Sequence, residues 1–470
     1  MLFPEFDFLY FFLFVLVFNW IFKKWKTLWQ IFLLLVSYLF YYFFSKKFLL
    51  LLIFVTLVNY FLGFLIFQQV VEKIKRKKLF LLTAIFFNFF VLFIFKYYDF
   101  FRSSFEILFS KLKNPSFLPV LNIVLPLGLS FYIFRILSFH FEILEQKIFP
   151  YPNLLEFSLF VAFFPYLLSG PIVRASEFLP QLRKGLKDKI ENFYAFITLI
   201  GIGLFKKLII STWLSTELVD DVFSVPENHS FLAIFLSVIS YALVIYCDFS
   251  GYSDLSIGFA GLLGFKTPIN FNYPYLASNL KEFWRRWHIT LSNFVRDYIY
   301  IPLGGSRKGI LRKYFNLLVA MIFIGLWHGP TLNFILWGTL QGLGLVFAHF
   351  LEDFTIFNFK KWKKFSTVLT FIFVSLAWIF FGTKNMENCI GVFKGLFSPQ
   401  TLFEPIKLYL IFLILIGLFF VILEQKIFNT LLFVENRLPS LIVIPLLFLI
   451  FVIIYKLTPD TIPSFIYFNF

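Results

Sequence analysis

Cysteine and charge are both scarce in this chain of 470 residues. The two cysteines, Cys247 and Cys389, lie far apart, which excludes a disulfide framework and the closely spaced ligands of a structural zinc site. Charged residues make up 14% of the chain and hydrophobic residues 60%, and the mean hydropathy is +0.84. These values exclude an ordinary soluble domain and are typical of a polytopic membrane protein.

Acidic residues are few relative to basic ones. The chain has 42 Lys and Arg against 26 Asp and Glu, a formal net charge of +16. The basic residues occur in short clusters between apolar runs, as at residues 23–26, and such clusters normally set membrane topology. Because no basic stripe on a soluble face is present, we expect a lipid bilayer as partner and no nucleic acid.

Long apolar runs dominate the rest of the chain. The first, 6–22, has no basic residues before it and no cleavage site after it, so we expect a retained helix with its N-terminus outside. About 11–13 membrane-spanning or re-entrant helices are expected in all. The runs lie at 6–22, 28–44, 48–68, 79–98, 119–143, 153–173, 193–213, 231–263, 314–328, 331–351, 366–382, 405–424 and 439–456. The predicted fold is an all-α polytopic integral membrane protein with a single domain over residues 1–470.

Residues 264–313 differ in composition from their surroundings. They are rich in Asn, Pro, Arg, Trp and Tyr and contain no apolar run of twenty residues, which predicts interfacial helices and a re-entrant segment. Elsewhere, Pro and Gly interrupt the runs at 125–128 and 164–171. At these two sites a broken helix and a kink repaired by neighbouring helices are both open.

His328 is the leading candidate for a catalytic residue. It ends the apolar stretch 314–327, which follows Arg312, and at about 1.5 Å per residue it lies roughly 20 Å from that charge, inside the hydrocarbon. Gly329 and Pro330 break the helix there, and non-helical backbone at such depth is tolerated where it lines a cavity. A neutral imidazole can take the proton of a hydroxyl that attacks a thioester. A histidine that only bonds a freed carbonyl is the alternative.

His288 is the second candidate, between Trp287 and Ile289. It can orient an acyl group, polarise its carbonyl or share the proton, or it can be an interfacial histidine without a chemical role. The nearby arginines 285, 286 and 296 are expected in structural ion pairs. Their available partners are Glu282, Asp297, Asp248 and Asp254.

The turn at 303–309 combines glycines with Arg307 and Lys308. Glycines allow close backbone approach and the cations suit phosphate, so a donor such as coenzyme A could bind at Arg307 and Lys308 from the cytoplasm. Charge that only sets topology is the alternative. Asp248 and Asp254 have no His or Cys at ligand spacing, so no metal site is expected.

Seven stretches, in the same order, resemble the membrane-bound O-acyltransferase family, in particular its bacterial branch typified by alginate O-acetylation proteins. They are LPLGLSFYIFRILS (125–138), FFPYLLSGPIVRASEFLPQL (163–182), GLFKKLIIS (203–211), YCDFSGYSDLSIGFAGLLGF (246–265), PYLASNLKEFWRRWHITLSNFVRDYIYIPLGGSR (274–307), LWHGPTLNFILWGTLQG (326–342) and LAWIFFG (376–382). Three positions depart from the usual pattern: Arg135, His140 and Gly382, the last standing where an arginine commonly follows the two phenylalanines.

The resemblance implies helices around a central cavity in the bacterial cytoplasmic (inner) membrane. It implies transfer of an acyl group, usually acetyl, from cytoplasmic acetyl-CoA to a hydroxyl of a cell-surface polysaccharide. Acetyl-CoA would be the donor, with no permanently bound cofactor. The family's catalytic histidine corresponds to His328 and its second prominent polar position to His288. A periplasmic partner of the SGNH esterase type commonly makes the last transfer. Broken helices and buried charge also suit a transporter or flippase of a lipid-linked glycan, which is the alternative hypothesis.

Overall fold

The computed structural model shows an all-α protein, which confirms the predicted fold class. The part of the chain that it describes contains α-, π- and 3₁₀-helices and no strand. The described residues are 3–72, 76–111, 119–121, 123–186, 189–355, 357, 359, 361–459 and 461–468.

The chain forms two compact units. Unit 1 comprises residues 1–190, 263–267 and 329–331, and unit 2 comprises residues 191–262, 268–328 and 332–470. Each unit combines parts of the chain that are separated in the sequence. The single domain expected over residues 1–470 stays a prediction. Both histidine candidates belong to unit 2.

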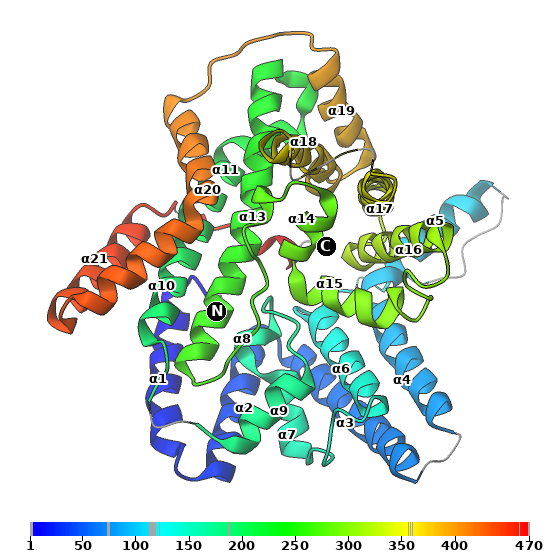
Figure 1. The fold of residues 1–470 in the computed structure, drawn as a ribbon, viewed down its shortest axis with the longest axis vertical. Coiled ribbons are helices and arrows are strands. Elements are labelled where there is room, and N and C mark those ends of the chain that lie inside the picture. Colours follow the sequence, from blue (N-terminus) through cyan, green and yellow to red (C-terminus); the bar gives the residue numbers. More distant parts are fainter. Residues whose placement is uncertain are drawn as a thin grey trace. The chain divides into compact units, whose positions relative to one another are not determined.

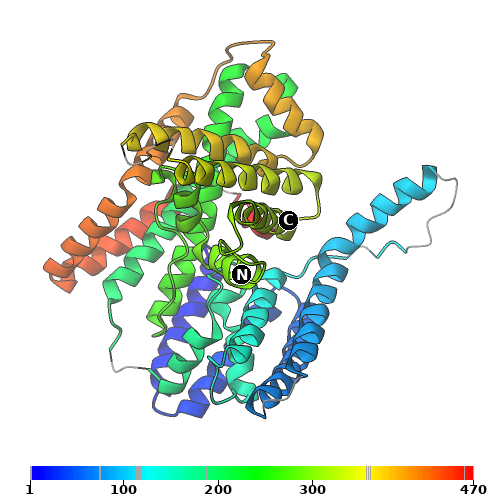
Figure 2. The ribbon, with the colours of Figure 1, turned by 45° about the vertical axis from the view of Figure 1, so that its right-hand side comes forward.

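Unit 1 is built from the first nine α-helices. They are α1 (Phe6–Phe22), α2 (Lys26–Tyr42), α3 (Lys46–Val71), α4 (Lys77–Leu92), α5 (Tyr98–Lys111), α6 (Leu129–Leu144), α7 (Leu154–Ala162), α8 (Phe164–Leu167) and α9 (Ala175–Lys184). The π-helical segment η1 (Phe93–Tyr97) joins α4 to α5, so that the three elements form one uninterrupted helix (Figure 2).

Unit 2 contains the remaining helices, with the long α13 running through it (Figure 1). Its first part holds α10 (Phe193–Leu204), η2 (Phe205–Ser211), α11 (Thr212–Leu214), η3 (Ser215–Val219), α12 (Asp220–Ser224), η4 (Pro226–Asn228) and α13 (Phe231–Leu262). The segment of distinct composition forms η5 (Pro274–Leu276), α14 (Leu280–Arg286), α15 (Ile289–Val295) and η6 (Arg296–Tyr300). The last part holds α16 (Ile310–His328), α17 (Leu332–Asp353), α18 (Lys363–Gly382), α19 (Met386–Phe397), α20 (Leu408–Arg437), α21 (Ser440–Lys456) and η7 (Ile466–Phe468).

Eight helices of the described chain are long and apolar enough to cross a membrane, so the protein is a multi-pass membrane protein. They span Lys46–Val71, Lys77–Glu106, Phe193–Ser224, Phe231–Leu262, Ile310–His328, Leu332–Asp353, Lys363–Gly382 and Leu408–Arg437. The shorter apolar helices α1 and α21 add to these. The segment 264–313 contributes only residues 310–313, the start of Ile310–His328, to the eight, which agrees with its composition.

Two of the expected spans are interrupted where Pro and Gly occur. The run at 119–143 is helical from Leu129 onward among its described residues, and Gly128 precedes that helix at φ 73°. The run at 153–173 is divided into α7 and α8 and continues without helix to Arg174. A repaired kink is therefore wrong at both sites: the helix is broken at 164–171, and at 125–128 a helix begins only after the Pro and Gly among the described residues.

Glycines bring α16 and α17 into close contact, which sets the position of His328 at the end of α16. A methyl group on Gly338 would lie 2.6 Å from the carbonyl oxygen of Met321, and one on Gly325 would lie 2.3 Å from that of Phe334. Small residues at such crossings allow backbones in a membrane to approach closely. This close contact holds the C-terminal end of α16, where His328 lies, against the side chains of α17.

Candidate active site

His328 lies in a closed aromatic setting at the C-terminal end of α16. Its side chain is 3% exposed. Ring centroids at 4.8 to 6.1 Å from its own belong to Trp327, Phe334, Trp337, Phe381 and Tyr467. This setting is drier than the water-lined cavity expected from the helix break.

His288 occupies the sharp turn between α14 and α15 and is 1% exposed. Its φ of 40° is left-handed, a conformation that is costly for most residues with a side chain and is enriched at functional sites. Burial lowers the pKa of His288 to about 3. The imidazole is therefore neutral near pH 7.

Asn270 determines which ring nitrogen of His288 carries the proton. The backbone N–H of Thr290 donates to Asn270 Oδ1 at 3.3 Å, so this atom is the acceptor oxygen of the amide. His288 Nδ1 lies 3.1 Å from the same oxygen and must therefore donate to it. The lone pair of His288 is consequently on Nε2. In this tautomer Nε2 can accept a proton but cannot polarise a carbonyl by donating a hydrogen bond.

Trp327 connects the two histidines. Its ring centroid lies 6.2 Å from that of His288 and 4.8 Å from that of His328. The ring of Phe249 on α13 lies 4.6 Å from His288 and 4.5 Å from Tyr467. The structure thus brings both predicted histidines into one aromatic cluster.

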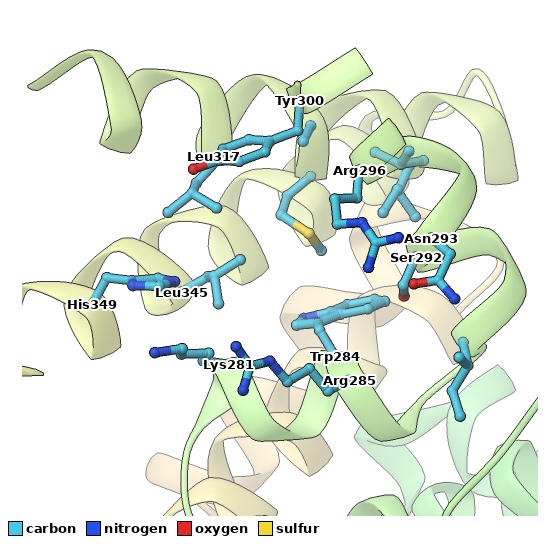
Figure 3. Close-up of a pocket in the computed structure, with 15 residues that line it drawn as sticks. Lys281, Trp284, Arg285, Ser292, Asn293, Arg296, Tyr300, Leu317, Leu345 and His349 are labelled. Atoms are coloured by element: carbon cyan, nitrogen blue, oxygen red, sulfur yellow. The ribbon is translucent and has the colours of Figure 1, made fainter. Parts of the chain in front are cut away.

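A basic cavity of about 350 Å³ is lined by residues of α14, α15, η6, α16 and α17 (Figure 3). On α16 it begins one helical turn before His328. Ile324 on α16 lines it, four residues before the histidine. Figure 3 shows Lys281 and Arg285 on α14 extending toward the side on which His349 lies. The lining residues are Lys281, Trp284, Arg285, Ile289, Ser292, Asn293, Val295, Arg296, Tyr300, Leu317, Ala320, Met321, Ile324, Leu345 and His349. The combination of cations and aromatic rings suits an anionic ligand with a planar group.

Two tryptophans link this cavity to His328. The ring of Trp284, in the cavity wall, lies 5.9 Å from that of Trp337, which lies 5.2 Å from the imidazole. Trp284 Nε1 donates to Gln341 Oε1 at 3.2 Å, which fixes the orientation of its ring. Neither Trp337 nor His328 lines the cavity, so the rings of Trp284 and Trp337 lie in series between the cavity and the imidazole.

The three arginines of the segment have different partners. Arg286 pairs with Glu282 at 2.7 Å and Arg296 with Asp297 at 2.7 Å. Arg285 has no carboxylate within ion-pair distance among the described residues. Of the three arginines, only Arg285 has a charge that no neighbouring acid balances among the described residues, and it lines the cavity wall.

Arg307 and Lys308 are exposed in the turn between η6 and α16, and neither lines the cavity. The glycines of the turn adopt positive φ, at 110° for Gly304 and 55° for Gly305, as the spacing of glycines predicts. Asn316 Nδ2 on α16 donates to the carbonyl oxygen of Gly305 at 2.9 Å and fastens the turn. A ligand-binding role for Arg307 and Lys308 stays a prediction.

Comparison with known proteins decides the family. Residues 33–389 match the profile of MBOAT, the membrane-bound O-acyltransferase family. The chain belongs to this family. The resemblance inferred from the seven stretches is therefore confirmed, and the protein is an O-acyltransferase. The alternative of a transporter or flippase has no comparable support.

The similar proteins include enzymes that modify polysaccharides. The acyltransferase is 35% identical over 369 residues to the peptidoglycan O-acetyltransferase of Helicobacter pylori, covering 72% of this chain and 68% of that protein. It is 33% identical over 375 residues to the probable alginate O-acetylase AlgI of Pseudomonas aeruginosa, covering 79% and 70%. A teichoic acid D-alanyltransferase of Bacillus subtilis is 28% identical over 295 residues, covering 57% and 72%.

A buried network of charges lies beside the histidines in unit 2 of the acyltransferase. Lys206 Nζ on η2 is 2.7 Å from Asp254 Oδ2 on α13 and also contacts Glu424 on α20. Tyr246 donates to the same glutamate at 2.6 Å. The next residue, Lys207, pairs with Asp248 at 2.6 Å. The two aspartates considered as arginine partners in the sequence are thus bound to lysines.

The other histidines make structural contacts. His140 Nε2 lies 2.9 Å from Asn59 Oδ1 in unit 1, and His229 Nδ1 lies 3.0 Å from Glu404 in unit 2. His349 lines the basic cavity. At the third departure from the family pattern, Gly382, a methyl group would lie 2.7 Å from the ring of Tyr241, so no side chain fits.

Several residues of this site were not predicted from the sequence. Asn270 and Tyr467 lie outside the seven family-like stretches, and Lys281 lies within one of them without having been singled out; only the structure brings the three next to the candidate histidines or the cavity. The signal available for Arg285 was its place in a cation-rich stretch between tryptophans.

Proposed function

We propose that this O-acyltransferase moves an acetyl group from cytoplasmic acetyl-CoA to a hydroxyl of a cell-surface polysaccharide, and that it acts in the bacterial cytoplasmic membrane. The names of the similar proteins support acetyl as the group and a polysaccharide as the acceptor. The apolar helices and basic clusters support the membrane location.

The observation that carries the proposal is the buried imidazole of His328 at a helix break, one turn from a basic cavity. His328 takes the proton from the acceptor hydroxyl as the hydroxyl oxygen attacks the thioester carbonyl. The C–S bond then breaks, the ester forms, and the thiolate of coenzyme A leaves and takes up the proton from the imidazolium. Burial strengthens each of these electrostatic contacts because water is excluded.

The basic cavity is the proposed site for the phosphate-bearing part of coenzyme A. Arg285 can donate charge-assisted hydrogen bonds to phosphate oxygens, and Lys281, which pairs with Glu352 at 2.7 Å, lies in the same wall. Trp284 and Tyr300 provide rings against which a planar base can stack. Arg307 and Lys308 lie near the cytoplasmic end of α16 in the predicted topology and are a second proposed contact for the donor.

His288 is proposed to share the proton with the reaction centre. Its Nδ1–H donates to Asn270, so Nε2 carries the lone pair and is the atom that accepts the proton in this role. Of the roles considered from the sequence, this one fits the tautomer, whereas polarisation of the carbonyl does not. A periplasmic protein of the SGNH esterase type is the proposed partner that completes transfer to the polysaccharide.

The test uses inverted membrane vesicles from cells that express the protein, supplied with acetyl-CoA labelled in the acetyl group. Wild-type vesicles should release thiol and place label in the polysaccharide fraction. His328→Ala should insert at normal levels and lose this activity at least a hundredfold, whereas His229→Asn should retain it. Full activity in His328→Ala overturns the assignment of the base, and absence of thiol release by the wild type supports a transporter instead.

A further inference from the structure

The segment of residues 463–468 packs against the active site. Phe465 is fully buried, and its ring lies 4.5 Å from that of Tyr252 and 5.7 Å from that of Phe249, both on α13. Tyr467 lies 4.5 Å from Phe249 and 5.3 Å from His328. The segment therefore supplies one wall of the aromatic enclosure around the proposed base.

One buried ion pair holds the backbone of this segment. Lys207 Nζ donates to the carbonyl oxygen of Pro463 at 2.9 Å while it pairs with Asp248 Oδ1 at 2.6 Å. The other carboxylate oxygen, Asp248 Oδ2, accepts the backbone N–H of Ile466 at 2.7 Å. The segment is short, with residues 463–465 irregular and Ile466–Phe468 forming the single turn η7, so these bonds from η2 and α13 hold backbone that no long helix stabilises.

The neighbouring ion pair does not have this arrangement. Lys206 is equally buried, at 1% exposed, but pairs with Asp254 and Glu424 and holds α13 and α20 to η2. Two adjacent lysines in one π-helical segment thus serve different elements. Because an ion pair in the membrane is expensive, each is expected to have a specific task.

We infer that Lys207 and Asp248 are positioning residues, whose ion pair holds the 463–468 segment against His328 and thereby excludes water from the reaction centre. The inference rests on the proposed function. With the segment in place, the acetyl thioester reaches the acceptor hydroxyl. When the segment is displaced, water takes the place of that hydroxyl, and its attack on the thioester yields acetate and free coenzyme A.

The experiment compares three changes in the vesicle assay. Lys207→Met removes the ammonium and keeps the apolar stem, Asp248→Asn keeps the shape of the carboxylate, and a chain ending at Pro459 lacks the segment. For each, label in polysaccharide measures transfer, and label in free acetate, corrected with vesicles that lack the protein, measures hydrolysis. Protein level in the membrane shows that each variant folds.

Each of the three changes should lower transfer at least tenfold and raise the ratio of hydrolysis to transfer. Loss of folding alone would lower both. In the shortened chain, Lys207→Met should lower transfer by less than a further twofold. The reason is that the effects of two changes that act through the same element do not add. Lys206→Met is the matched control, and its effect should be the same in the full and shortened chains. Lys207→Arg should recover part of the transfer.

Three results would overturn the inference. One is a shortened chain that transfers acetyl within twofold of the wild type. Another is a further tenfold loss from Lys207→Met in that chain, and the third is a hydrolysis ratio that stays at the wild-type value. An inactive wild type would contradict the proposed function itself, and is thus distinguishable from all three.

Discussion

At the scale of single residues, the burial of the two candidate histidines could be predicted and their surroundings could not, while their catalytic roles stay predictions. An imidazole in an apolar chain, followed by Gly329 and Pro330, is visible in the sequence because each of these residues is costly inside a membrane. Asn270 is one asparagine in a loop with several, so nothing marks it as the residue that sets the tautomer of His288. Selectivity for the donor also belongs to this scale, since it depends on individual cations.

Arg285→Ala should impair use of acetyl-CoA and spare S-acetylpantetheine, which lacks the nucleotide phosphates. A hydrogen bond to a charged group contributes about 1.5–3 kcal/mol, so KM for acetyl-CoA should rise roughly tenfold to a hundredfold. Steady-state thiol release with both donors measures the change. The comparison variant replaces Arg307 and Lys308 by alanine. If that variant shows the selective loss and Arg285→Ala does not, the phosphates bind at the glycine turn.

At the scale of elements, the residues at which helices end could be predicted better than the π-helical segments inside them. α16 ends at His328, as Gly329 and Pro330 predict, and the run at 153–173 is broken where its prolines occur. The π-helical segments η2 and η6 have no sequence signal, because they arise from packing that competes with the regular ladder. The crossing of α16 and α17 likewise depends on which glycines face each other.

Gly338→Ala should lower stability and activity together. Its new methyl group would lie 2.6 Å from the carbonyl oxygen of Met321, and overpacking of this kind costs about 1–3 kcal/mol. A displacement of α16 would also move His328, and an error of about 1 Å can cost a hundredfold in rate. Thermal unfolding in detergent and thiol release measure the two effects.

Gly201→Ala on α10 is the matched control, because nothing lies within 4 Å of its added methyl group. Alanine favours a helix over glycine by about 1 kcal/mol, so this variant should be unchanged or slightly more stable. Equal behaviour of the two variants would show that the α16–α17 crossing can relax.

At the scale of the whole molecule, composition was enough to predict the class of protein. It was not enough to predict which distant segments pack together. Hydropathy predicts a polytopic protein, and the eight long apolar helices confirm it. The packing of the 463–468 segment near His328 could not be predicted, because the segment is apolar and uncharged and its partners are far away in the sequence. Orientation in the membrane stays a prediction from the distribution of charge.

Lys308→Cys tests that orientation. The turn is exposed, and the natural cysteines Cys247 and Cys389 are buried, so a membrane-impermeant maleimide should react mainly at position 308. Labelling is expected in inverted vesicles and not in right-side-out spheroplasts, because basic turns remain in the cytoplasm. Labelling in spheroplasts alone would reverse the orientation and place the basic cavity on the wrong side for acetyl-CoA.

The paired lysines of η2 also have a consequence for biosynthesis. Lys207 meets its carboxylate partner Asp248 after 41 residues (248 − 207), whereas Pro463 follows Lys207 by 256. At a translation rate of about 5–20 residues per second, those 256 residues take roughly 10–50 s to leave the ribosome. During this interval the insertion machinery must accommodate a helix whose second ammonium group still lacks its last hydrogen-bond acceptors, so maturation of the enzyme is completed only after nearly the whole chain has been made.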